Sequence, residues 1–394
     1  MKIKIHRGQN QIGGSIIEIA SSSTKIILDV GAELDEDDAP VVPQIDGLFC
    51  GKAGYNAVFL SHYHIDHVGL ADKILDGIPI YMGEKAFEIM RSSNEYRNIK
   101  SVFSPLFMRD GEPIIVGDLK ITPLSCDHSA FDSYMLLVEK DGKRILYTGD
   151  FRANGRGEFD ELLKKLPTVD TVIIEGTTLS REYTTRNIEE KKLEDIGVNT
   201  IKNSISPCFI YCASTNIDRL ITARNIAKRT KRLFLEDIYT AQMADCSEVD
   251  EIVPKRGEIY AFLTHGGDKE YNALQQFSNA KIGRDTIAKK SFLMTVRPSM
   301  IGYLEKLSNL VSFSGGTLFY ALWKGYQEQP YVRRLLDFME NKGVKIHTLH
   351  TSGHADSQTI DELISAISPK TIIPVHTENA GYFEKFSDKF DVIF

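Results

Sequence analysis

Residues 61 to 67 read Ser-His-Tyr-His-Ile-Asp-His and follow directly on the apolar run 57–60. Three imidazoles and one carboxylate therefore lie within six consecutive positions. Imidazole nitrogens suit zinc and other borderline transition metals, and a carboxylate can bind one cation or bridge two. A strand that ends in a tight loop would direct His62 and His64 to one side and Asp66 and His67 to a second position. The motif predicts a hydrolytic site for two metal ions rather than a histidine-rich surface loop.

A site for two metals needs more ligands than this loop can supply. Further histidines and aspartates lie at the ends of predicted strands or in short motifs that follow them. These residues are Asp29, His128, Asp150, His354 and His376. No Gly-x-Ser-x-Gly elbow and no Cys-His arrangement suggests a covalent nucleophile, so water is the expected nucleophile and hydrolysis the expected reaction class.

Several of these motifs together resemble the metallo-β-lactamase fold in its β-CASP branch. The resemblance extends over nearly the whole chain and is closest to the ribonuclease J group and its short microbial relatives. It rests on the 61–67 motif with Asp29 and His128, on Thr148-Gly149-Asp150-Phe151-Arg152, on the acidic motif 172–178, and on Ser352-Gly353-His354-Ala355 with Pro374-Val375-His376-Thr377-Glu378.

The resemblance implies a pair of zinc ions, with manganese as a possible replacement. By position, the first zinc would be held by His62, His64 and His128, and the second by Asp66, His67 and His376, with Asp150 bridging them. Asp29 would not bind a metal itself but would orient a metal ligand or the water. An ordinary aspartate in a turn is the alternative interpretation of this residue. A histidine at position 376 resembles the RNA-cleaving members of the branch.

The same resemblance assigns catalytic roles to Asp66, Asp150, Glu175 and His354. Glu175 would hold the His354 imidazole, which would protonate the departing oxygen. The alternative for Glu175 is a surface charge at a strand end, and for His354 a structural histidine.

A loop that leads into a predicted helix, 214–219, resembles the segment with which the family binds a backbone phosphate. Free N–H groups at a helix start suit an anion, but a plain helix N-cap explains Ser214 or Asn216 equally well. The residues predicted to contact phosphate are Ser214, Asn216, Arg219 and Ser352.

The predicted function is a zinc-dependent hydrolase of phosphodiester bonds, a ribonuclease acting on single-stranded RNA. The alternative is a hydrolase of a small ester, lactone or nucleotide that uses the same metal ligands. A third possibility, an RNA-binding protein without activity, is disfavoured because the full ligand set together with Glu175 and His354 is present. The resemblance leaves assembly into a homo-oligomer open.

Composition fits a soluble globular protein, with 42% hydrophobic and 26% charged residues in a chain of 394. The net charge of −7 is not the footprint of a strongly basic nucleic-acid binder, but a local basic groove and bound zinc could offset it. Five scattered cysteines suggest reduced thiols. No segment is long and apolar enough to cross a membrane, and we expect a cytoplasmic protein.

Short strands dominate the first part of the chain, and strands alternate with helices from about residue 180 to 345. With the resemblance, this pattern predicts a mixed α/β fold, a four-layer αββα sandwich with an inserted α/β β-CASP domain. The expected divisions are 1–180 and 346–394 for the sandwich and 181–345 for the insertion. The charged run 186–202 is expected to form a long, solvated helix at the boundary.

Overall fold

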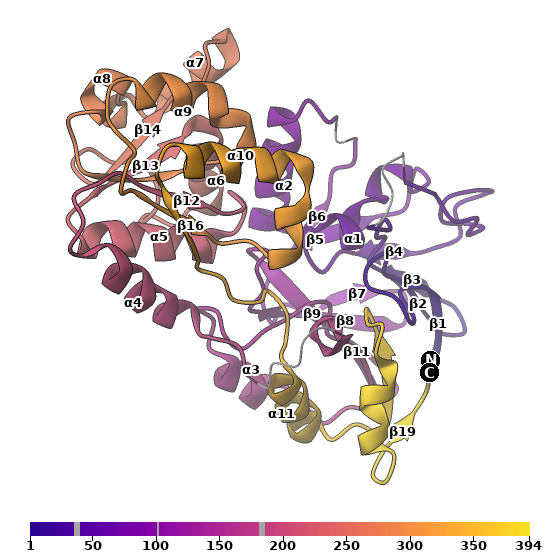
Figure 1. Cartoon of the computed structure of the whole chain (residues 1–394). Helices are drawn as coiled ribbons and strands as arrows, with labels where there is room; N and C mark the ends of the chain where they lie inside the picture. The colour runs from indigo at the N-terminus through magenta and orange to yellow at the C-terminus, as the bar shows by residue number, and fades with distance from the viewer. Residues whose placement is uncertain (35–39, 101, 181–185) are drawn as a thin grey trace. The chain divides into compact units, whose positions relative to one another are not determined.

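The computed structural model describes residues 1–34, 40–100, 102–180 and 186–394. They form two compact units, one made of Met1–Asn187 with Gly353–Phe394 and the other of Ile188–Ser352 (Figure 1). We call them the split unit and the inserted unit. The predicted boundary at residue 181 lies outside the described residues, and the assignment of a β-CASP domain to the insertion stays a prediction.

The first sheet of the split unit contains six strands in chain order. The pairs from β1 to β3 are antiparallel, and those from β3 to β6 are parallel. The strands are β1 (Lys2–Arg7), β2 (Ile16–Ala20), β3 (Lys25–Leu28), β4 (Ala57–Phe59), β5 (Ile80–Gly83) and β6 (Leu106–Met108).

The second sheet of this unit has the strand order β19-β18-β11-β10-β9-β8-β7. Strands β10, β11 and β18 are parallel neighbours, so their carboxyl ends meet at one edge of the sheet. The strands are β7 (Ile114–Val116), β8 (Leu119–Cys126), β9 (Ser133–Lys140), β10 (Lys143–Tyr147), β11 (Thr171–Glu175), β18 (Thr371–Val375) and β19 (Asp391–Val392).

One apolar core lies between the two sheets and joins Ile19 and Phe59 of the first to Leu136 and Ile173 of the second. A second core covers the outer face of the second sheet. It packs β-strand residues against α3 (Phe159–Lys165) and α11 (Ser357–Ile367). Helix α2 (Glu84–Tyr96) contacts β5 of the first sheet, and α1 (Ile65–Val68) follows β4. These layers confirm the predicted four-layer α/β sandwich.

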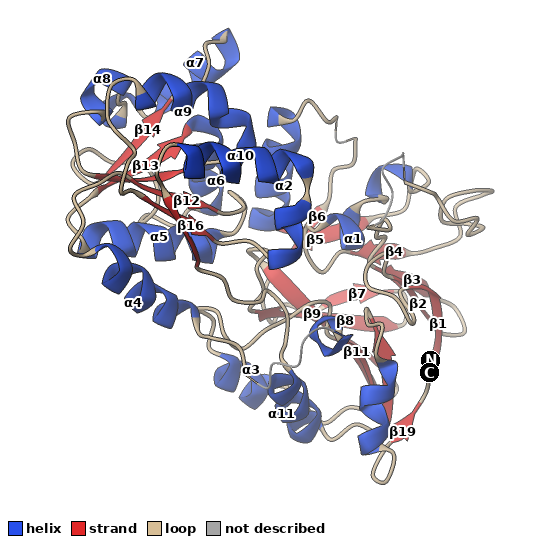
Figure 2. Ribbon diagram, viewed as in Figure 1, coloured by secondary structure: helices blue, strands red, loops and turns tan. Residues whose placement is uncertain are grey.

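The inserted unit is built on six parallel strands in the order β14-β13-β15-β12-β16-β17, connected mainly by helices (Figure 2). The strands are β12 (Cys208–Tyr211), β13 (Leu233–Asp237), β14 (Ile259–Phe262), β15 (Phe292–Thr295), β16 (Thr317–Tyr320) and β17 (Lys345–Thr348). The helices are α4 (Glu190–Ile201), α5 (Ile217–Arg229), α6 (Ile238–Ser247), α7 (Asp268–Gln276), α8 (Arg284–Ile287), α9 (Ile301–Ser308) and α10 (Pro330–Asn341).

Short 3₁₀ helices complete the described secondary structure. They are Ala71–Lys73, Thr177–Ser180, Ser278–Ala280, Pro298–Met300, Lys324–Glu328 and Ala380–Phe386. Within the described ranges, no helix combines the length and the hydropathy needed to cross a membrane.

The helix expected over 186–202 is shorter than predicted and is not solvated on all sides. It spans Glu190–Ile201, and the Glu190 side chain at its start is fully buried. One face of this helix is exposed, as expected for a solvated helix, but the other face is buried and contains Glu190, Leu193, Gly197 and Ile201. Glu190 forms a buried ion pair with Arg219.

Candidate metal centre

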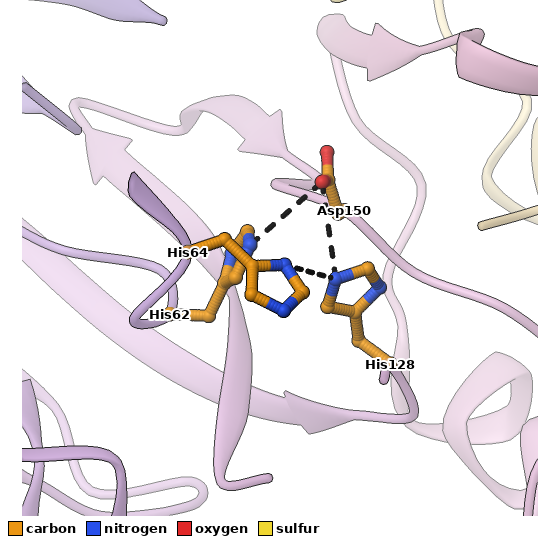
Figure 3. Close-up of side chains that lie close together, drawn as sticks. All are labelled: His62, His64, His128 and Asp150. Carbon is orange, nitrogen blue, oxygen red and sulfur yellow. Dashed lines mark hydrogen bonds and ion pairs between the residues drawn. The ribbon is translucent and has the colours of Figure 1, made fainter. Parts of the chain in front are cut away.

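The split unit brings the sequence-predicted metal ligands together in overlapping groups that share Asp150. In each group, one candidate ligand atom per residue lies within 4.8 Å of the others. The groups are His62, His64, His128 and Asp150 (Figure 3); Asp66, His67, Asp150 and His376; and Asp150, Glu175 and His354. Asp150 is therefore the centre of the whole arrangement.

The sheets explain why residues far apart in the sequence meet here. The 61–67 motif follows β4, while Asp150 and His376 follow strands β10 and β18 at the same edge of the second sheet. Close backbone packing fixes the loops. At Gly31, for example, a Cβ atom would lie 1.7 Å from the carbonyl oxygen of Asp66. Glycine is required there because the loop that carries Asp66 lies directly against it.

In the first group, imidazole nitrogens point toward each other and toward Asp150. His128 Nε2 lies 3.1 Å from His64 Nδ1 and 3.9 Å from Asp150 Oδ2, and His62 Nε2 lies 3.7 Å from the same oxygen (Figure 3). The other ring nitrogen of His128, Nδ1, is 2.5 Å from the Gly353 carbonyl oxygen, to which it can donate. That bond would leave Nε2 with a lone pair for a cation.

The second group shares the same Asp150 carboxylate. His67 Nε2 is 3.2 Å from Asp150 Oδ2, and His376 Nε2 is 3.1 Å from Asp66 Oδ2. The Thr177 hydroxyl lies 2.7 Å from His376 Nδ1 and fixes the orientation of that ring. Two imidazoles and two carboxylates form a donor set that suits a divalent transition metal.

Asp29 lies behind the ligands and does not point into the groups that surround Asp150. Its carboxylate accepts hydrogen bonds from the backbone N–H and hydroxyl of Ser61 at 2.7 and 2.8 Å, and from the Tyr147 hydroxyl at 2.7 Å. It also lies 2.7 Å from His67 Nδ1. A proton on that nitrogen would hold His67 in the tautomer that turns Nε2 toward Asp150.

We expect Asp29→Asn to weaken zinc affinity by about 10- to 100-fold, because the amide is a poorer acceptor for the His67 N–H and offers a competing donor. Asparagine tolerates the left-handed backbone at Asp29, where φ is +59°. Zinc titration with a competing chelator measures the change. Asp141→Asn is the matched control, since this exposed aspartate also has a positive φ of +50°. Equal zinc affinity in the two variants would contradict the role given to Asp29.

Buried polar atoms provide a test of whether the centre fits metal ions. His62 Nε2, His67 Nε2 and both carboxylate oxygens of Asp150 are buried and form no hydrogen bond with another described group. Leaving such atoms unsatisfied is costly, whereas cations between them would satisfy all four. The residues therefore fit the metal pair that the sequence predicts.

The electrostatics of the histidines agree with a role as metal ligands. Burial lowers the pKa of His64 to about 4 and that of His62 and His128 well below the usual value, which favours the neutral imidazole that binds metals. Burial also acts to lower the pKa of His67, but the carboxylates of Asp150 and Asp29 outweigh it and raise that pKa. A bound cation would oppose this rise and favour the neutral ring.

The predicted acid pair lies beside these groups. His354 Nδ1 is 3.3 Å from Glu175 Oε2 and 3.5 Å from Asp150 Oδ2, and its side chain is 20% exposed. Glu175 is buried and accepts backbone N–H bonds from Phe151 at 3.0 Å and from Thr177 at 3.2 Å. The carboxylate is thus fixed, while the imidazole still reaches solvent.

The phosphate-binding prediction receives a correction in the inserted unit. Arg219 is fully buried, and its guanidinium is bonded to Glu190 and to the carbonyls of Ala321 and Leu349. These contacts assign it to the packing of this unit rather than to a phosphate. The Asn216 side chain caps α5 by accepting from the Arg219 N–H at 3.0 Å.

The other two residues predicted to contact phosphate, Ser214 and Ser352, are not assigned to packing or to a helix cap. The Ser214 hydroxyl lies 2.8 Å from that of Thr240 in the inserted unit. Ser352 is the last residue of this unit and is partly exposed. Their binding of phosphate stays a prediction.

Several residues that support the predicted ligands lie in or next to the predicted motifs, although the sequence assigns them no role. Ser61 and Tyr147 hold Asp29, Thr177 contacts His376, and the Gly353 carbonyl faces His128. The positions of Ser61 and Thr177 beside predicted ligands were the available signal. The Gly353 carbonyl could not be identified from the sequence, because every residue has a backbone carbonyl.

Two family models match parts of this chain, and curated proteins are similar to nearly all of it. Residues 48–201 match the beta-lactamase superfamily domain, and residues 343–390 match the Zn-dependent metallo-hydrolase RNA specificity domain. Ribonuclease J of Mycoplasma pneumoniae is 22% identical over 96% of this chain and 68% of its own length. Ribonuclease J 1 of Streptococcus pyogenes is 22% identical over 94% of this chain and 67% of its own length.

A shorter match and a solved structure add to this comparison. An RNase J-like protein of Methanocaldococcus jannaschii is 25% identical over 60% of this chain and 58% of its own length. The crystal structure of a protein of unknown function from Enterococcus faecalis aligns with a TM-score of 0.83 at 21% identity, covering 100% of this chain and 97% of that one. At this identity the structural match shows the fold alone.

Proposed function

Because the chain belongs to the metallo-β-lactamase fold family, in the β-CASP branch with ribonuclease J, we propose that it is a zinc-dependent ribonuclease that hydrolyses phosphodiester bonds of single-stranded RNA with two metal ions. The observation that carries the proposal is the shared, buried Asp150 carboxylate between two sets of metal-binding side chains. The inserted unit would be the β-CASP domain.

Each set would hold one cation, with Asp150 common to both. His62, His64 and His128 would hold the first, and Asp66, His67 and His376 the second. When bound, two divalent cations lower the pKa of a water molecule and offset the negative charge of a phosphodiester during in-line displacement.

The remaining residues would orient these ligands and move a proton. Asp29 keeps His67 in one tautomer through Nδ1. Glu175 holds Nδ1 of His354, so that the other ring nitrogen can protonate the oxygen that departs from phosphorus. The partial exposure of the imidazole lets it regain its proton from solvent.

We expect His354→Ala to lower kcat by about 10²- to 10⁴-fold while leaving zinc content unchanged, because the imidazole would act on the proton and both sets of metal-binding residues stay complete. RNA cleavage and metal analysis of the same samples measure the two effects. His347→Ala removes an exposed histidine and serves as the control. If His354→Ala also lost zinc, the imidazole would instead be a metal ligand.

The function is tested with 5′-labelled RNA and DNA of equal length and with the zinc- or manganese-loaded protein. Cleavage of single-stranded RNA that is lost in an Asp66→Ala, His67→Ala variant is the expected result. The product ladder separates endonucleolytic from 5′-exonucleolytic action. No RNA cleavage, together with turnover of small chromogenic esters, would favour the alternative hydrolase of a small substrate.

A further inference from the structure

Asp127 and Arg152 form an ion pair that joins two segments of the candidate metal centre. Asp127 directly precedes His128, and Arg152 follows Asp150 by two positions. The Nε of Arg152 donates to Oδ1 of Asp127 at 2.5 Å, and the two side chains are 0% and 7% exposed. The backbone N–H of Arg152 also donates to the carbonyl oxygen of Asp127, at 2.8 Å. Two bonds therefore connect the neighbour of His128 to a residue close to Asp150.

Pairing between strands does not set the distance between His128 and Asp150. His128 follows β8 and Asp150 follows β10, and β9 lies between these two strands in the sheet. Because β8 and β10 each pair with β9 and not with each other, a contact beyond the strand ends is needed to hold the two loops together. The separation to be held is the 3.9 Å between His128 Nε2 and Asp150 Oδ2 (Figure 3).

The loop that follows Arg152 is built around the ion pair. The backbone N–H of Gly157 donates to Oδ2, the second carboxylate oxygen of Asp127. A Cβ atom at Gly155 would lie 2.1 Å from Oδ1 of Asp127 and 2.5 Å from an Nη atom of Arg152. The φ of Gly155 is not positive, so close approach to the ion pair requires glycine there, and backbone conformation does not.

Stability is a weak explanation for this ion pair. Taking two charges out of water costs free energy that their attraction returns only in part. The Gly353 carbonyl orients the ring of His128 through Nδ1, but it does not fix the backbone segment from which the ring extends. Asp150 has separate support, because the N–H of Phe151 donates to Glu175 at 3.0 Å. The placement of His128 relative to Asp150 therefore depends most on the ion pair.

We propose that Asp127 and Arg152 are positioning residues that set the separation of His128 from Asp150, and thereby the affinity of the first set of ligands for zinc. This inference rests on the proposed two-metal function. Residues that hold a metal ligand in place contribute about 10- to 100-fold to metal affinity. An ion pair with a structural role alone would instead stabilise the fold and leave the zinc affinity of the folded chain unchanged.

Zinc titration with a competing chelator tests the proposal. The titration uses chains that also carry Asp66→Ala, His67→Ala, a background in which the first set of ligands is complete and the second is not. Arg152→Gln removes the guanidinium, whereas Arg152→Lys keeps the positive charge and a donor. Gly155→Ala places a methyl group against the ion pair and leaves every charge in place.

The matched control is Gly381→Ala in the same unit. Gly381 also has no positive φ, and its added Cβ would make only an ordinary contact, 3.7 Å from Asn379 Oδ1. Circular dichroism shows whether each chain is folded at the temperature of the titration. Urea denaturation of the metal-free chains measures stability separately from zinc affinity.

We expect Arg152→Gln and Gly155→Ala each to weaken zinc binding by about tenfold or more, with Arg152→Lys intermediate and the control unchanged. Reduced stability with unchanged zinc affinity would overturn the proposal, because the ion pair would then only support the fold. A loss confined to Arg152→Gln would also overturn it, since charge and not spacing would be responsible. If Arg152→Gln does not fold, Gly155→Ala decides.

RNA cleavage by the unaltered chain separates this inference from the proposed function. If that chain binds zinc but does not cleave RNA, the ribonuclease proposal fails, and the comparison of zinc affinities still decides the role of the ion pair. If it cleaves RNA while all variants bind zinc equally, only the positioning role is wrong. A chain that binds no zinc would overturn both.

Discussion

Asp150→Asn is expected to abolish RNA cleavage, with a fall in kcat/KM of about 10³-fold or more, and to remove at least one metal ion. The carboxylate lies in all three groups of candidate ligands, and no other described residue does. An amide has the same shape, but it carries no charge and can offer only one acceptor oxygen to two cations. Metal analysis and single-turnover cleavage of labelled RNA measure the two losses.

The control for this variant is Asp388→Asn, the same change at an exposed position of the split unit. It should retain full metal content and activity. If Asp150→Asn kept two metal ions, Asp150 would not be the shared ligand, and the proposed two-metal arrangement would be wrong. If it lost metal but kept full RNA cleavage, the activity would not depend on this centre.

Glu190→Ala is expected to destabilise the inserted unit by about 3–5 kcal/mol. Glu190 and Arg219 form an ion pair at 2.8 Å, with both side chains fully buried. Without the carboxylate, the guanidinium would remain buried with an uncompensated charge, and the Thr222 hydroxyl would lose its acceptor. Urea denaturation followed by tryptophan fluorescence measures this unit alone, because the single tryptophan, Trp323, belongs to it.

The matched control removes an exposed ion pair of the same unit. Arg229 and Asp195 lie 2.7 Å apart with side chains 44% and 64% exposed, so Arg229→Ala should cost about 1 kcal/mol or less. Zinc content should be retained in both variants, since the proposed ligands lie in the split unit. A similar small change for Glu190→Ala would show that the buried pair contributes little beyond its desolvation cost.

The sequence was sufficient to predict the residues that gather around Asp150, because their signals are local. His62, His64, Asp66 and His67 lie within one loop, and Asp150 and His376 each follow an apolar run. Strand ends converge at one edge of a sheet, so such positions can be identified before the strand order is known. The four-layer fold followed from the same motifs through the family resemblance.

The pairing of Glu190 with Arg219 could not be predicted in this way. The charges of 186–202 alternate in sign, and nothing in their spacing distinguishes the one side chain that is buried. Its partner lies 29 positions along the chain, and only the packing of α4 on α5 brings the two together. For the same reason Arg219 resembled a phosphate ligand, because its position at a helix start is visible in the sequence and its burial is not.

The sequence signals for helices α6 and α11 differ in strength. Helix α6 has six buried residues among ten and little apolar periodicity, so its sequence gives a weak helical signal. In α11 the apolar residues Ile360, Leu363, Ile364 and Ile367 have regular helical spacing and are all buried. That helix could have been predicted from the pattern alone.

The late position of His376 and Gly353 in the chain has a consequence for biosynthesis. A nascent polypeptide that ends before residue 350 already contains the 61–67 motif, His128 and Asp150, but not the carbonyl that faces His128 or the imidazole beside Asp66. Strand β18 must also pair with β11 before His376 reaches its place. Under the proposed two-metal arrangement, full metal loading would have to follow translation of these segments, and a bound metal pair would mark completed folding.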